Sequence, residues 1–104
     1  MPEMTFTVRW PDGVVEECYS PSLVVHEHLE AGTDYRVEEF SRRATYALSI
    51  AGDRVQEIFG FACTSAISTT EQIQTRAAAY APDEVVRVLG MHDGESRARP
   101  EQRA

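Results

Sequence analysis

Cys63 is the side chain with the most reactive chemistry in this sequence. It stands directly before Thr64 and Ser65, where the hydrophobic pattern predicts that a helix begins. Backbone N–H groups without partners and the positive end of the helix dipole favour a thiolate there, so the pKa of the thiol is expected to fall. A small buried residue at a junction between two helices is the other interpretation, and both stay open.

A second group of polar side chains lies within five residues at the expected end of a strand. These side chains are Cys18, Tyr19, Ser20 and Ser22. A thiol, a phenol and two hydroxyls could form the rim of a small binding pocket. The alternative is a core cysteine followed by a proline turn that the hydroxyls cap. Together with the Cys63 segment, these residues are the candidates for binding a ligand or partner, and none is assigned a catalytic role.

The histidines do not form a recognisable metal site. His26 and His28 would point about 200° apart on a helix and would share a face only on a strand. The sequence has neither a Cys-x-x-Cys nor a His-Glu-x-x-His pattern, and it has no Gly-rich phosphate loop. We therefore predict no metal and no other cofactor.

The charge of the chain argues against two classes of partner. The net charge of the 104 residues is −7, and three acids balance three arginines within the last twelve residues. The acidic remainder contains no lysine. It lacks the basic stripe that nucleic acids and anionic membranes require, so we predict neither partner. No signal peptide and no apolar run of ~20 residues is visible, which predicts a cytoplasmic protein with reduced cysteines.

The N-terminal segment predicts a β-hairpin. Apolar and polar residues alternate over Met4–Trp10, Pro11–Gly13 suits a three-residue turn, and a second strand follows over Val14–Tyr19. This register gives a core face made of Met4, Phe6, Val8, Trp10, Val14 and Cys18. A two-residue turn would slip the second strand by one residue and turn its other side chains inward. We favour the three-residue turn.

Two long helices are predicted in the middle of the chain. The first covers about Tyr35–Phe59, with Asp34 as its cap and Gly60 as its end. Its apolar stripe consists of Val37, Phe40, Ala44, Ala47, Leu48, Ala51, Val55, Ile58 and Phe59. The second covers about Thr64–Tyr80 and is expected to turn inward Ala66, Ile67, Thr70, Ile73, Ala77 and Tyr80.

A short helix and a late strand complete the predicted elements. Ser22 could cap a short helix over Leu23–Glu30, although its two valines also suit a strand. The apolar run Val85–Leu89 predicts a mostly buried strand. The predicted fold is α+β, in which the C-terminal strand completes a three-stranded sheet with both long helices on one face. It is one domain over residues 1–92, followed by a disordered tail over residues 93–104.

Several segments of the sequence resemble a known protein family. The matching segments and residues are Phe6–Gly13, Glu17–Val24, Gly32, Tyr35, Phe40 and Gly60–Ala66. In this order, over residues 2–89, they resemble the small nitrogen-starvation response proteins that are encoded beside a nitrilase. The resemblance implies a role in the assimilation of nitriles or cyanide as a nitrogen source. It implies no reaction and no catalytic residue.

Two functional hypotheses follow from these observations. The first is a small non-catalytic accessory protein that serves an enzyme encoded in the same gene cluster. The alternative is a small thiol-dependent enzyme or ligand-binding domain that uses Cys63 near the Cys18–Ser22 segment. A three-stranded sheet with one bare face also has a free edge, either at the second hairpin strand or at Val85–Leu89, and this predicts a homodimer.

Overall fold

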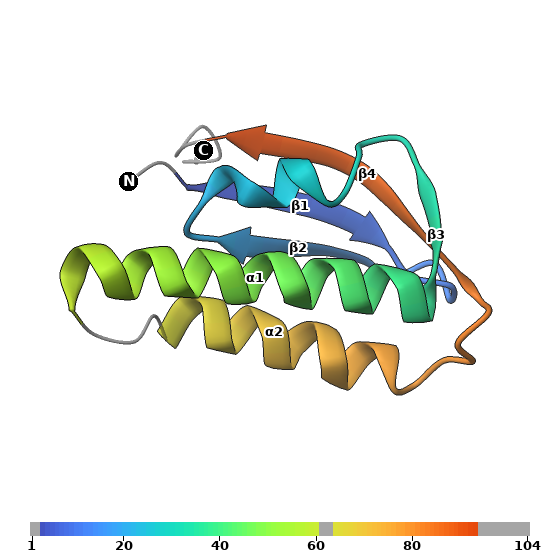
Figure 1. The fold of residues 1–104 in the computed structure, drawn as a ribbon. Coiled ribbons are helices and arrows are strands. Elements are labelled where there is room, and N and C mark those ends of the chain that lie inside the picture. The colour runs from blue at the N-terminus through green and yellow to red at the C-terminus, as the bar shows by residue number, and fades with distance from the viewer. Residues whose placement is uncertain (1–2, 61–63, 94–104) are drawn as a thin grey trace, which may run out of the picture.

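A four-stranded antiparallel sheet carries both long helices on one face (Figure 1). The computed structural model describes residues 3–60 and 64–93. Its elements in chain order are β1 (Met4–Arg9), β2 (Val15–Ser20), the 3₁₀ helix η1 (Leu23–Glu27), β3 (Asp34–Arg36), α1 (Val37–Phe59), α2 (Thr64–Ala77) and β4 (Val85–Asp93). The strand order across the sheet is β2-β1-β4-β3. The predicted α+β class is confirmed.

The hairpin of β1 and β2 has the predicted three-residue turn. The Trp10 N–H donates to the Val14 carbonyl, and the Gly13 N–H donates to the Trp10 carbonyl, both at 2.8 Å. Gly13 has a φ of 91°, a left-handed conformation that only glycine adopts without steric cost. Phe6 therefore lies opposite Cys18, as the predicted register requires. Val14 was wrongly placed in the core, because it lies in the turn beyond both strands and is 39% exposed.

The predicted three-stranded sheet is wrong, because Asp34–Arg36 forms a fourth strand, β3. This strand pairs antiparallel with β4, and Tyr35 lies opposite Val86. The sequence analysis assigns these residues to the start of the first long helix, because Asp34 is a suitable helix cap. Three residues are also too few to show a period of two. The helix α1 begins only at Val37, and Asp34 pairs with Arg87 instead of capping the helix.

The late strand β4 lies inside the sheet, between β1 and β3, and not at an edge. It runs from Val85 to Asp93, four residues beyond its predicted end. Its pairing with β1 shifts between Val88 and Gly90, which leaves Leu89 as an extra, bulged residue. The free edges of the sheet are therefore β2 and β3. Residues 94–104 of the predicted tail lie outside the described residues.

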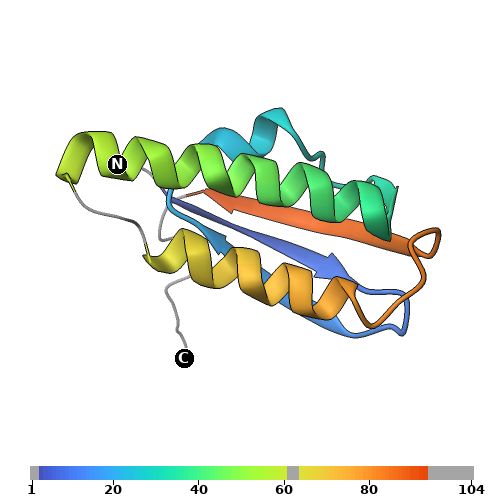
Figure 2. The ribbon, with the colours of Figure 1, turned by 60° about the horizontal axis from the view of Figure 1, so that its bottom comes forward.

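The core fills the space between the sheet and the two helices. Its largest fully buried side chains are Trp10, Phe6, Phe40, Met4, Leu48 and Ile73. The Trp10 ring meets Phe40 edge-on at 5.4 Å and stacks on Tyr80 at 5.7 Å between centroids. Figure 2 shows the same layering from another direction, with α1 and α2 side by side over the sheet.

The predicted helical stripes are right in their centres and wrong at the connection between the helices. Seven predicted stripe residues of α1 are buried, but Ile58 and Phe59 are exposed. Figure 1 shows the reason, since the end of α1 projects beyond the sheet. Ile67, near the start of α2, is exposed and lines a groove between α1 and α2. Gly60 ends α1 with a φ of 81°, as predicted.

The short helix predicted after Ser22 is confirmed, although it is a single 3₁₀ segment that ends at Glu27. The Ser22 hydroxyl accepts a hydrogen bond from the Val24 N–H at 3.3 Å and caps it. Val24 and Val25 are buried and anchor η1 against α1. No helix in the described parts of the chain is long and apolar enough to cross a membrane.

Candidate functional site

The first candidate residue, Cys63, lies outside the described residues. Thr64 is the first residue of α2 and is exposed, and Ser65 is half-buried beside it. Ser22, which follows the end of β2, lies near the same end of the molecule as the start of α2. Arg54 in the last part of α1 donates a hydrogen bond to the Ser22 hydroxyl at 3.3 Å. The proposed reactivity of Cys63 stays a prediction.

Cys18 is a core residue of β2, which confirms the structural interpretation of this thiol. It is fully buried opposite Phe6. Burial disfavours the thiolate and raises the pKa of the Cys18 thiol to about 12, with a further contribution from the carboxylates of Glu16 and Glu17. A protonated, enclosed thiol is a poor nucleophile at neutral pH. The Gln72 amide nitrogen lies 3.9 Å from the sulfur.

Tyr19 lies on the face of the sheet opposite to Cys18, because neighbouring residues of a strand point to opposite sides. Its hydroxyl donates a hydrogen bond to a Glu3 carboxylate oxygen at 2.8 Å. The phenol and the Cys18 thiol are therefore separated by the sheet and do not line one pocket.

Ser20 and Ser22 are brought together, and their hydroxyls hold the turn after β2. The Ser20 hydroxyl donates to the Ser22 carbonyl at 2.8 Å and accepts from the Ser22 N–H at 3.3 Å. Both residues are buried. Since Ser22 also caps η1 and accepts from Arg54, its hydroxyl is used for structure.

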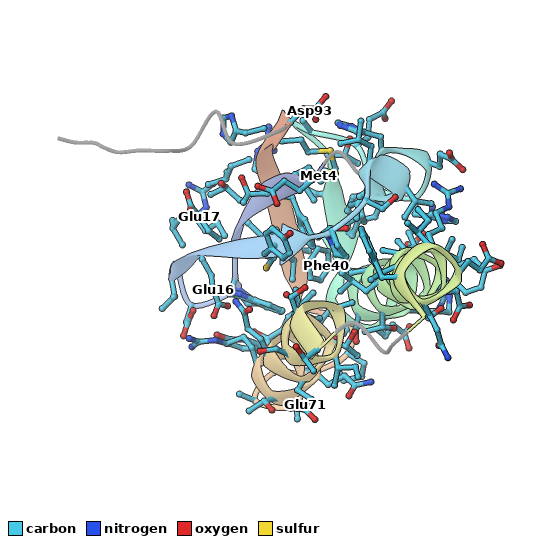
Figure 3. All side chains as sticks on the ribbon, turned by 90° about the vertical axis from the view of Figure 1, so that its left-hand side faces the viewer. Met4, Glu16, Glu17, Phe40, Glu71 and Asp93 are labelled. Carbon is cyan, nitrogen blue, oxygen red and sulfur yellow. The ribbon has the colours of Figure 1, made fainter. Side chains whose placement is uncertain are left out.

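A long groove separates α1 from α2 on the outer surface of the helical layer. Its volume is about 440 Å³, and its walls include two carboxylates and two amides, contributed by Asp53, Gln56, Glu71 and Gln74. The lining hydroxyls bond helix carbonyls, as when Thr45 donates to Ser41 at 2.7 Å. Among the described residues, no basic side chain lines this groove. The carboxylate and amide oxygens of the groove can accept hydrogen bonds from a ligand. Figure 3 shows that the Glu71 side chain is directed to the outside.

The second surface of interest is the open face of the sheet, which neither long helix covers. Figure 3 shows Glu16 on the side of α2 and Glu17 on the opposite, open side of β2. The apolar side chains that are exposed there are Val15 (56%), Val85 (50%) and the bulged Leu89. Thr5, between Tyr19 and His92, is only 5% exposed. The accessible part of the open face is therefore the end near the hairpin turn.

The hairpin end of the open face also carries arginines from three strands. Arg9 of β1 lies directly opposite Arg87 of β4, and Arg36 of β3 lies opposite Val85. Arg87 donates to Asp34 at 3.0 Å. The sequence pattern does not single out these arginines as a group. Alternation places Arg9 outward, but its pairing with Arg87 follows only from the strand order.

The histidines have partners other than each other. His26 lies 2.7 Å from an Asp93 carboxylate oxygen on the surface, and the His28 ring meets Tyr46 edge-on at 5.2 Å. Within residues 3–60 and 64–93, no three His, Cys, Asp or Glu side chains are grouped to hold a metal ion.

Together, the fold and these surfaces define a two-layer α+β protein whose sheet is covered on one face and open on the other. A family model described as "Nitrogen starvation-induced protein NitG" matches residues 5–91. The chain therefore belongs to the NitG family. No curated protein and no solved structure matches the chain. The nitrogen-starvation part of the resemblance is thereby confirmed.

Proposed function

We propose that this protein is a non-catalytic accessory protein that binds an enzyme made during nitrogen starvation. The family is described by its induction under nitrogen starvation, which gives the physiological setting. The resemblance noted in the sequence extends this setting to a nitrilase-linked assimilation of nitriles or cyanide, and we propose a cytoplasmic location on the sequence pattern alone. The proposed partner is accordingly the nitrilase encoded in the same cluster.

The observation that carries this proposal is the open face of the sheet. Exposed valines of β2 and β4 lie there beside arginines of β1 and β4. Arginine is enriched at protein interfaces, and buried apolar contacts supply most of the driving force for association. The strands that carry these residues are held by pairing within the sheet, so little conformational entropy is lost when a partner binds.

A binding assay with the purified nitrilase tests this proposal. We expect the wild-type chain to elute together with the enzyme in size-exclusion chromatography. A double variant, Val15→Asp and Val85→Asp, should lose this co-elution because it places two carboxylates on the open face. The matched control is Ile58→Asp, which changes an exposed apolar residue at the projecting end of α1. Binding that is equally weak for both variants, or absent in the wild type, contradicts the proposal.

We also propose that the protein forms a homodimer. The edge strand β2 supports this proposal, because one side of its backbone is unpaired within the sheet, whereas β4 is internal. Symmetric pairing of two β2 edges would satisfy outward-facing backbone groups, and two-fold dimers are the commonest soluble assembly. Light scattering at micromolar concentration is expected to give about twice the 11.7 kDa of one chain. A mass near 11.7 kDa that does not change with concentration would exclude the dimer.

A further inference from the structure

Two arginines lie directly opposite each other on the open face, in a protein whose net charge is −7. Arg9 and Arg87 are cross-strand partners of the two central strands. Their neighbours Val8, Trp10, Val86 and Val88 are buried on the covered face, so both arginine side chains leave from the open face. Like charges in directly opposite positions destabilise a sheet. An anion between them would turn this repulsion into attraction.

The charges around this pair leave one guanidinium without compensation. Arg87 makes a single hydrogen bond to Asp34, at 3.0 Å. Arg9 has no ion pair or hydrogen bond through its side chain among the residues that the structure describes. Arg36 is directed to Glu38, 3.5 Å away. Among the described residues that line the cavity at this place, two guanidinium charges less the Asp34 carboxylate leave a single positive charge.

A small cavity lies at this place. Its volume is about 260 Å³, and its walls include Arg9, Arg87, Asp34 and Val85. The Val85 side chain is exposed and supplies an apolar surface next to the two guanidinium groups. This volume is below the ~300–1,000 Å³ of pockets for drug-sized ligands. The cavity therefore suits a small ligand.

We propose that Arg9 and Arg87 form a binding site for a short-chain aliphatic monocarboxylate. The planar guanidinium groups match the geometry of a carboxylate and donate charge-assisted hydrogen bonds to both of its oxygens. The single excess positive charge matches one carboxylate, whereas the Asp34 carboxylate and the acidic body disfavour a doubly charged phosphate. The aliphatic chain of the ligand lies against Val85. This site needs no partner enzyme and so goes beyond the accessory role proposed above.

Titration of the isolated full-length protein with sodium butyrate tests the site. Nuclear magnetic resonance of the arginine side-chain N–H groups should show saturable shifts at Arg9 and Arg87. Arg9→Gln should weaken binding at least tenfold, because it removes the uncompensated guanidinium. The matched control is Arg42→Gln, which makes the same change of charge on the exposed surface of α1 and should bind like the wild type. Equal weakening in both variants would overturn the proposal, since it would show a general effect of net charge.

Thermal unfolding at low salt separates binding from a structural role. Arg9→Gln should unfold no earlier than the wild type, because it removes the repulsion between like charges. Butyrate should raise the midpoint of the wild type and leave that of Arg9→Gln unchanged. Butylammonium chloride should have no effect on either. A phosphate effect as large as that of butyrate would overturn the assignment to a carboxylate, and an acetate effect as large would overturn the contact with Val85. No nitrilase is present in this assay, so its failure would leave the accessory role standing.

Discussion

The two faces of the sheet differ in the burial, the polarity and the charge of their side chains. On the covered face, Met4, Phe6 and Val8 of β1 and Trp10, which follows the strand, are buried under α1 and α2. On the open face, β1 presents Thr5, Thr7 and Arg9. Two neighbouring residues thus supply the largest buried ring of the protein and an arginine without an ion pair among the described residues.

Under the function proposed above, this difference separates stability on one face from recognition on the other. The covered face provides the apolar burial on which a domain of 104 residues depends. The buried Trp10 ring has its polar atom satisfied, because its indole N–H donates a hydrogen bond to a Glu16 carboxylate oxygen at 2.8 Å. Residues of the open face can change with little effect on folding. The predictions below measure how sharply the two roles are divided.

The largest effect is expected for Trp10→Ala. It removes a buried ring that contacts Phe40 and Tyr80, and such truncations cost about 3–5 kcal/mol. Urea unfolding followed by circular dichroism measures the loss. Val15→Ala on the open face is the control and should change stability by no more than about 0.5 kcal/mol. Similar losses for the two variants would show that the open face is not separate from the core.

The next largest effect is expected for Cys18→Ser. The new hydroxyl would be enclosed on the covered face opposite Phe6, and an unsatisfied buried hydroxyl costs about 1–3 kcal/mol. Cys18→Ala should cost less, because alanine introduces no polar group. The urea concentrations at the unfolding midpoints of the serine and alanine variants measure this difference in stability. A serine variant as stable as the alanine variant would mean that a neighbour such as Gln72 satisfies the hydroxyl.

A smaller effect is expected from pH, and it also reports on the covered face. The pKa of the Cys18 thiol is about 12 in the folded protein and 9.0 in the reference state. Above pH 9 the unfolded chain loses this proton and the folded chain retains it, so stability falls as pH rises. The thiol should lower the free energy of unfolding by about 1 kcal/mol at pH 10. Cys18→Ala should lack this contribution of the thiol. If the free energy of unfolding changed with pH in the same way for the wild type and for Cys18→Ala, the prediction would be wrong.

The smallest effect is expected at the edge strand β2. The Gln72 amide donates to the Glu17 carbonyl at 3.2 Å, so α2 covers one backbone group of the free edge. Gln72→Ala should cost about 0.5–1.5 kcal/mol or less, the usual range for an exposed hydrogen bond. It should also strengthen self-association if the dimer forms through β2, because the carbonyl becomes available. Glu71→Ala, at the neighbouring position of α2, is the control. Light scattering on both variants distinguishes an edge contact from a contact elsewhere.

The sequence predicted those parts of the fold that local chemistry determines. The turn residues and the alternation of β1 are sufficient for the hairpin register, and this register places Cys18 inside and Tyr19 outside. The short strand β3 and the internal position of β4 depend on contacts between distant segments, which no local pattern encodes. The same reason hid the arginine pair, since Arg9 and Arg87 are 78 positions apart in the chain and meet only through the strand order. Of the candidate site residues, the inward position of Cys18, the outward position of Tyr19 and the local roles of Ser20 and Ser22 in the turn were accessible from sequence.

The bulge at Leu89 divides β4 into two halves of opposite phase. Before it, the even-numbered Val86 and Val88 are buried, and after it the odd-numbered Met91 packs against the core. If β4 continued through Leu89 without a bulge, alternation would direct Gly90 and His92 inward and Met91 outward, leaving a void and a polar ring under the helices. The bulge prevents this, because Leu89 alone has no partner on β1 and Gly90 resumes the pairing after Val88. Deletion of Leu89 would therefore give a regular strand with the same residues inward, whereas insertion or deletion of one residue elsewhere in β4 would reverse the faces beyond it.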